Sequence, residues 1–107
     1  MKIEVLYVPS CPNLPLAIQR IHEALILVNI RAEIQVLVVR DNSDAARLEF
    51  PGSPTIRVND RDVEPVPPRD HNAGLQCRIY SGTQNSGAPD RESIVRVLRE
   101  AVREEAR

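Results

Sequence analysis

The chain has 107 residues, 42% of them hydrophobic, and its 14 basic and 15 acidic side chains nearly cancel. This length and composition suit one globular domain spanning residues 1–107. The lack of a basic excess argues against nucleic acid and anionic membrane surfaces as partners. No apolar run reaches the length of a membrane span, and no leader pattern precedes the first predicted strand. We therefore expect a cytoplasmic protein, and we expect it to be a monomer.

The first 29 residues predict a strand that passes through a tight turn into a helix. Residues 2–8 alternate and then run apolar, which is typical of a strand that becomes buried. From Leu14 onward the apolar residues follow helical spacing, with Arg20 and His22 on the polar side. Asn13 is the expected N-cap and Asn29 the expected stop. The apolar stripe of this helix consists of Leu14, Ala17, Ile18, Ile21, Ala24, Leu25 and Val28.

The next segments predict a second strand, a short helix and a hairpin. Residues 32–39 form a strand whose continuously apolar end indicates cover on both faces, parallel to the first strand through a right-handed crossover. Residues 41–48 read as a loop and a short helix with Ser43 as N-cap. Two short runs, 55–58 and 61–63, flank Asn59-Asp60 and predict a hairpin.

The last third of the chain is less regular until its final helix. We interpret residues 64–74 and 81–88 as loops, and residues 75–80 as a short extended piece. Asp90 is the expected N-cap of the last helix. Its Arg and Glu residues, with i,i+4 pairs such as Arg96–Glu100, indicate a solvated face. Its core stripe is expected to be Ile94, Val97, Leu98, Ala101 and Val102.

Two short segments carry a resemblance to a known superfamily. The turn Ser10-Cys11-Pro12-Asn13 follows the first strand, and Gly52-Ser53-Pro54-Thr55 opens the third. Together they resemble the thioredoxin-like and glutaredoxin-like proteins. The resemblance implies an α/β fold with a four-stranded mixed sheet, in order 2-1-3-4, flanked by helices. It also implies that the first and last helices pack on one face, and that a cis Pro54 faces Cys11.

The same resemblance implies thiol–disulfide chemistry at Cys11. A thiolate is the nucleophile in such exchange, and a helix N-terminus stabilises a thiolate. The backbone of Ser53 would stay free to pair with an extended substrate. With Pro12, Pro54 and Thr55 it would form the substrate platform. No metal or bound cofactor is expected, and the partners would be glutathione, as co-substrate, or protein thiols and disulfides.

The sequence departs from the superfamily's CxxC motif, because Leu14 holds the place of the second cysteine. A CxxC dithiol mechanism is therefore excluded. Either Cys11 works alone with a thiol such as glutathione, as in monothiol glutaredoxins, or Cys77 acts as the resolving thiol. Alternatively, Cys77 is a purely structural residue. His71 is a candidate base that would act on the Cys11 thiol.

Two further classes of function stay open. The first is a non-catalytic binding or scaffold protein, in which Cys11 is a small apolar filler. The second is mercury binding related to organomercurial lyases, in which both cysteines would converge with Asp70 or Asp62, since soft thiolates bind mercury.

Overall fold

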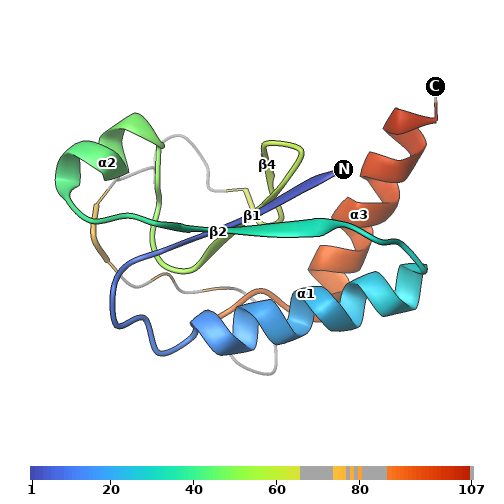
Figure 1. Ribbon diagram of the computed structural model, residues 1–107, viewed down its shortest axis with the longest axis horizontal. Helices are drawn as coiled ribbons and strands as arrows, with labels where there is room; N and C mark the ends of the chain where they lie inside the picture. The colour runs from blue at the N-terminus through green and yellow to red at the C-terminus, as the bar shows by residue number, and fades with distance from the viewer. Residues whose placement is uncertain (66–73, 77, 79, 81–86, 107) are drawn as a thin grey trace.

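The computed structural model describes residues 1–65, 74–76, 78, 80 and 87–106. Its strands form one mixed sheet in the order β2-β1-β3-β4, with helices on both sides (Figure 1). β2 runs parallel to β1, whereas β3 is antiparallel to β1 and β4 is antiparallel to β3. The α/β class and the strand order predicted from the sequence are confirmed. The elements in chain order are β1 (Lys2–Tyr7), α1 (Leu14–Val28), β2 (Glu33–Val38), α2 (Asn42–Arg47), β3 (Thr55–Val58), β4 (Arg61–Asp62) and α3 (Arg91–Glu105).

The larger core lies between the sheet and the two long helices, α1 and α3. The register of β1 and β3 places Ile3 opposite Val58 and Val5 opposite Ile56, so these four side chains share one face. α1 and α3 pack against each other and cover this face with their apolar stripes. The helical residues buried there include Ala17, Ile21, Ala24, Leu25, Ile94, Val97, Leu98 and Ala101.

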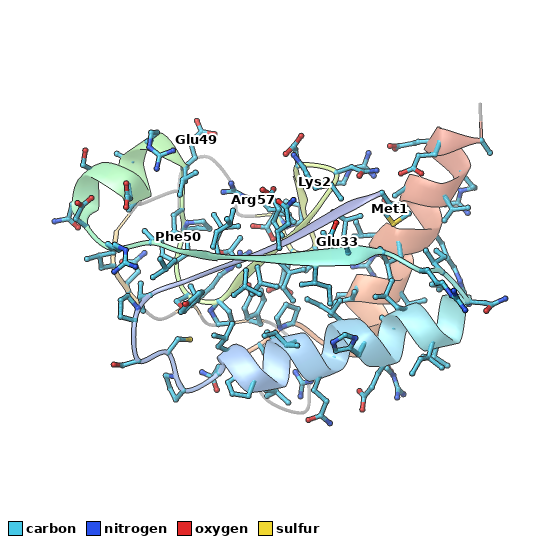
Figure 2. All side chains as sticks on the ribbon, in the orientation of Figure 1. Met1, Lys2, Glu33, Glu49, Phe50 and Arg57 are labelled. Atoms are coloured by element: carbon cyan, nitrogen blue, oxygen red, sulfur yellow. The ribbon has the colours of Figure 1, made fainter. Side chains whose placement is uncertain are left out.

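A smaller core lies on the opposite face, under α2. Leu6 of β1 points to this side and joins Val39, Ala45 and Phe50, all essentially without solvent exposure. Phe50, which follows α2, lies between that helix and the sheet (Figure 2). The N-cap of α2 is Asp41, whose carboxylate accepts a hydrogen bond from the Asp44 amide at 2.8 Å. The prediction of Ser43 as N-cap is therefore wrong, because an aspartate two residues earlier already caps the helix.

β2 is an edge strand, which corrects one expectation. The apolar end of this segment predicted cover on both faces, but Val36 is 45% exposed. Only Val39, just beyond the strand, is fully buried. A strand with one neighbour in the sheet lies at the margin of the helical layers, and its side chains are only partly covered.

The residues predicted to form the hairpin turn and to end α1 are found in those roles. Asn59 and Asp60 both have positive φ, at 50° and 68°, the pattern of a two-residue type I′ hairpin turn. Asn29 ends α1 in the left-handed conformation. Asn13 and Asp90 precede α1 and α3 as expected, although neither side chain makes a capping hydrogen bond.

α3 differs from its prediction in two details. Val102 is 41% exposed and lies outside the core, because the buried stripe is narrower than the one predicted. Glu100 does not pair with Arg96 but reaches Arg61 of β4 at 3.2 Å. Near the C-terminal end of the helix, the amino group of Met1 lies 3.9 Å from the Glu105 carboxylate (Figure 2).

Within the described ranges, no helix has both the length and the apolar character needed to cross a membrane.

Arg20 is buried, although helical spacing placed it on the polar side of α1. One of its terminal nitrogens donates to the carbonyls of Ala88 and Pro89, each at 3.1 Å. These two residues lead into α3. The arginine therefore joins α1 to the segment that starts the last helix.

We expect Arg20→Met to lower the free energy of unfolding by about 1–3 kcal/mol, because two buried carbonyls lose their donor. The matched control is Gln19→Met, at the exposed neighbouring position, which should change stability little. Urea unfolding followed by circular dichroism measures both variants. Equal midpoints for the two variants would contradict the bridging role of Arg20.

Candidate functional site

The Cys11 turn and the Ser53 segment lie at the same end of the sheet. β1 pairs with β3 so that Leu6 lies opposite Thr55, which brings the end of one strand beside the start of the other. The Val8 amide donates to the Ser53 hydroxyl at 3.1 Å. Cys11 in turn donates its amide to the Val8 carbonyl at 3.2 Å. Two hydrogen bonds and one shared residue therefore connect the two segments that sequence analysis singled out.

Cys11 is a free, partly exposed thiol on the turn between β1 and α1. The residue before it, Ser10, has a left-handed backbone with φ of 68°, which tightens the turn. Pro12 is exposed. Gly87 packs against the Asn13 side chain, so closely that a Cβ added to Gly87 would lie 2.4 Å from the Asn13 side-chain nitrogen. The segment that leads into α3 therefore packs closely on the start of α1.

The predicted substrate platform is buried. The peptide bond between Ser53 and Pro54 is cis, in agreement with the sequence pattern. Ser53 and Thr55 have 1% and 0% exposure, and Pro54 is also buried. The Thr55 hydroxyl donates to the Gly52 carbonyl at 2.6 Å.

The backbone of Ser53 is already paired within the chain. Its amide donates to the Gln76 carbonyl at 2.8 Å, and its carbonyl accepts from the Arg78 amide at 3.0 Å. The expectation that Ser53 presents a free backbone to an extended substrate is therefore wrong for this conformation. The physical reason is that residues 76 and 78 of the chain already fill the position where a substrate strand would add.

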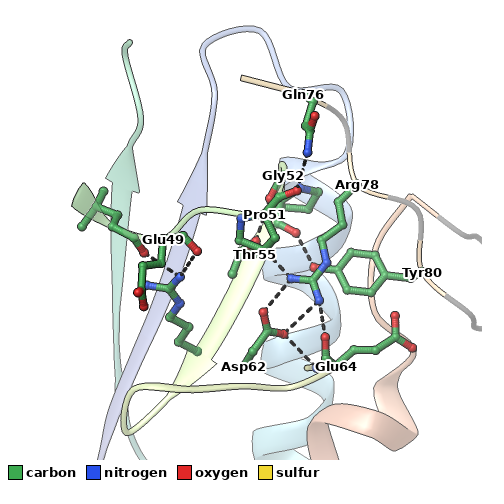
Figure 3. Close-up of polar contacts among 12 residues, drawn as sticks. Glu49, Pro51, Gly52, Thr55, Asp62, Glu64, Gln76, Arg78 and Tyr80 are labelled. Atoms are coloured by element: carbon green, nitrogen blue, oxygen red, sulfur yellow. Dashed lines mark hydrogen bonds and ion pairs between the residues drawn. The ribbon is translucent and has the colours of Figure 1, made fainter. Parts of the chain in front are cut away.

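Arg78 holds this segment in place through a buried network (Figure 3). Its two terminal nitrogens contact the two carboxylate oxygens of Asp62 at 2.7 and 3.1 Å, a paired geometry that arginine suits. The first of these nitrogens also donates to the Thr55 hydroxyl at 3.1 Å, and the second donates to the Glu64 carbonyl. Four acceptors therefore surround one buried guanidinium group.

Tyr80 continues the network towards Pro54. Its ring lies under the Arg78 guanidinium, with the guanidinium carbon 4.4 Å from the ring centre, a cation–π contact. Its hydroxyl donates to the Pro54 carbonyl. Burial raises the pKa of Tyr80 well above the usual value for a tyrosine, and the nearby Arg78 charge only partly opposes this effect.

Gly52 permits the close approach of Arg78. Its φ of +148° is a conformation that residues with a side chain rarely adopt. A Cβ at this position would lie 2.9 Å from the Cβ of Arg78. A glycine just ahead of Ser53 is therefore what lets the Arg78 segment lie against the cis-proline turn.

The structure places the remaining sequence candidates less favourably or not at all. Cys77, His71 and Asp70 lie outside the described residues, so the proposed resolving and base roles stay predictions. Asp62, one of the carboxylates considered for mercury, is engaged with Arg78. In the described part of the chain, no group of three or more His, Cys, Asp or Glu side chains is arranged to hold a metal ion.

Sequence reasoning missed Arg78, Tyr80 and the role of Gly52. The only local signal was a glycine next to the Ser53-Pro54 pair. Nothing in residues 75–80 marked an arginine for burial.

No family model matches this chain, and no curated protein or solved structure matches it either.

Replacing Arg78 with lysine tests the network. Arg78→Lys keeps the positive charge but loses the paired donors, because an ammonium group cannot reach all four acceptors at once. We expect it to lower the free energy of unfolding by about 1–3 kcal/mol. The control Arg47→Lys changes an exposed arginine and should have little effect. A stability of Arg78→Lys equal to that of the wild-type chain would rule out an energetic role for the paired geometry.

Tyr80 should make stability fall at alkaline pH. In the unfolded chain a tyrosine ionises near pH 10, whereas the raised pKa keeps Tyr80 protonated in the folded protein. Below about pH 10 both states hold the proton. Above it the unfolded chain binds fewer protons, so the free energy of unfolding falls as the pH rises, by up to about 1.4 kcal/mol per unit.

The comparison of wild type with Tyr80→Phe isolates this effect from other groups that titrate in the same range. The variant should be less stable at neutral pH, because the Pro54 carbonyl loses its donor. Its stability should then fall less steeply between pH 10 and about 12. If the free energy of unfolding fell equally with pH in both proteins across that range, Tyr80 would not be the group responsible.

Proposed function

We propose that the chain is a thioredoxin-like protein that carries out thiol–disulfide exchange through the single thiol of Cys11, with glutathione as its partner. The observation that carries the proposal is the place of Cys11. It is a partly exposed free thiol at the carboxyl end of β1, two residues before the N-cap of α1, and connected to the cis Ser53–Pro54 turn through Val8.

The step itself needs only one protein thiol. The Cys11 thiolate attacks one sulfur of oxidised glutathione, a mixed disulfide forms, and the other half leaves as glutathione thiolate. A second glutathione can reverse the step by attacking the glutathione sulfur of the mixed disulfide. Leu14 in place of a second CxxC cysteine is compatible with this route, and a reducing compartment such as the cytoplasm would supply the partner.

The closed Ser53 edge supports a small partner over an extended protein strand. Strand addition needs a free amide and a free carbonyl, and both groups of Ser53 are bonded to residues 76 and 78. A tripeptide thiol needs less docking surface.

The same closure favours a second candidate function. A protein that keeps this fold but binds partners elsewhere would need neither a reactive thiol nor an open edge. In that case Cys11 would be a structural residue of the turn.

Glutathionylation separates the two candidates. We expect intact-mass measurement after exposure to oxidised glutathione to show one glutathione on the wild-type chain and on Cys77→Ser, and none at this site on Cys11→Ser. The wild-type adduct should be removed by reduced glutathione. If Cys77 resolves, the wild-type chain will instead carry an internal disulfide that both single variants lack.

Reactivity must also exceed that of an ordinary thiol. The rate of adduct formation at Cys11 should be well above that of the chain unfolded in urea under the same conditions. A rate equal to that of the unfolded chain would favour the non-catalytic reading.

A further inference from the structure

The charges of α3 are separated between two flanks of the helix. On one flank, Glu100 and Glu104 bind Arg61 of the β3–β4 hairpin at 3.2 and 2.5 Å. Glu105 accepts a hydrogen bond from Asn59 of the same hairpin at 2.8 Å. The acidic residues in the C-terminal half of the helix are therefore used to hold α3 against the hairpin.

The arginines on the other flank have no such partners. Arg96, Arg99 and Arg103 are exposed, and none of them makes an ion pair within the described residues. Arg99 and Arg103 are four residues apart on one helix face, where like charges destabilise the helix. A surplus of positive charge that costs stability is expected to serve something other than folding.

A groove lies beside these arginines, and the residues that line it come from α1 and α3. The two helices pack against each other (Figure 1). The volume of the groove is about 380 Å³, and Leu27 of α1 and Val95 of α3 contribute its apolar surface. Leu27 is 57% exposed although it belongs to a packed helix. Arg91, Arg96, Arg99 and Arg103 also line the groove, together with one carboxylate, that of Glu92. Glu92 lies 3.8 Å from Arg91, so the lining keeps an excess of positive charge.

We propose that this groove between α1 and α3 binds an acidic amphipathic helix of a partner protein. The apolar side of such a helix would cover Leu27 and Val95, and its carboxylates would meet the three unpaired arginines. A nucleic acid or an anionic headgroup would use the arginines alone and leave the apolar surface exposed. The groove belongs to the two long helices and includes no residue of the Cys11 turn, so this proposal stands apart from the thiol chemistry.

The direct test uses a fluorescein-labelled 18-residue peptide with leucines at helical i, i+3, i+4, i+7 spacing and glutamates on both sides. Fluorescence anisotropy should show saturable binding to the full chain that weakens as salt increases. The double variant Arg99→Glu/Arg103→Glu should bind at least about tenfold more weakly. The control Arg47→Glu reverses one charge on α2, across the sheet, and should change the affinity less than about twofold.

Two further arms test the apolar half of the site. Leu27→Ser should also weaken binding of the peptide, and a peptide with serines in place of its leucines should bind more weakly to the wild-type chain. Loss of affinity only with the arginine variants would overturn the helix proposal in favour of a simple anion site. Tighter binding of a DNA duplex or of phosphatidylglycerol vesicles through the same arginines would overturn it as well.

Stability gives an independent readout. Arg99→Glu should not lower the melting temperature, because Arg103 would then face an acid four residues away instead of a like charge. A clear drop in the melting temperature would show that the arginine serves the fold, and would remove the argument from surplus charge.

Discussion

The ion pair between Arg78 and Asp62 is the interaction on which the arrangement around the Cys11 turn depends. A buried guanidinium is unfavourable unless it is paired and hydrogen-bonded, and here Asp62, Thr55 and Glu64 accept hydrogen bonds from both terminal nitrogens of Arg78. Because the side chain of Arg78 is held from below by β3 and β4, its main chain is fixed against Ser53. One residue thus contributes both the anchor and the strand-like pairing. Gly52 and Tyr80 adapt to it, the first by leaving space and the second by stacking beneath the charge.

Because of this anchoring, the Cys11 turn and the Ser53 turn differ in solvent exposure, although they lie at the same end of the sheet. The thiol side stays partly open, while the Ser53 side is buried and bonded. A partner can therefore reach the sulfur without finding a backbone edge to pair with. For the proposed thiol exchange, that asymmetry favours a small thiol compound as partner, because recognition of such a compound does not depend on strand addition.

The sequence predicted what local patterns determine. Helical and strand periods located the elements, and Asn59-Asp60 and Asn29 located two turns. The strand order was expected from the resemblance carried by the Cys11 and Ser53-Pro54 segments, and the sheet has that order. The sequence did not predict the burial of Arg78, because that depends on Asp62, 16 residues earlier. An alternating pattern would turn the apolar Leu75 towards the core and Arg78 towards solvent. The structure shows the reverse, with Leu75 45% exposed and Arg78 buried. Arg20 escaped prediction for the same reason, because the carbonyls that bind it lie 68 and 69 residues away.

Long-range pairing also decides how α3 presents its charges. Arg61 lies far from α3 in sequence, yet it attracts Glu100 and Glu104 to the hairpin side. By doing so it removes Glu100 from Arg96, its natural partner at i,i+4 spacing on an isolated helix. The hairpin thus draws Glu100 and Glu104 to its own side of α3 and leaves the flank of Arg96, Arg99 and Arg103 with an excess of positive charge. Without Arg61, Glu100 would be free to pair with Arg96, and the excess of positive charge on that flank of α3 would be smaller. The positive groove is therefore a consequence of tertiary structure, although every residue that builds it is visible in the sequence.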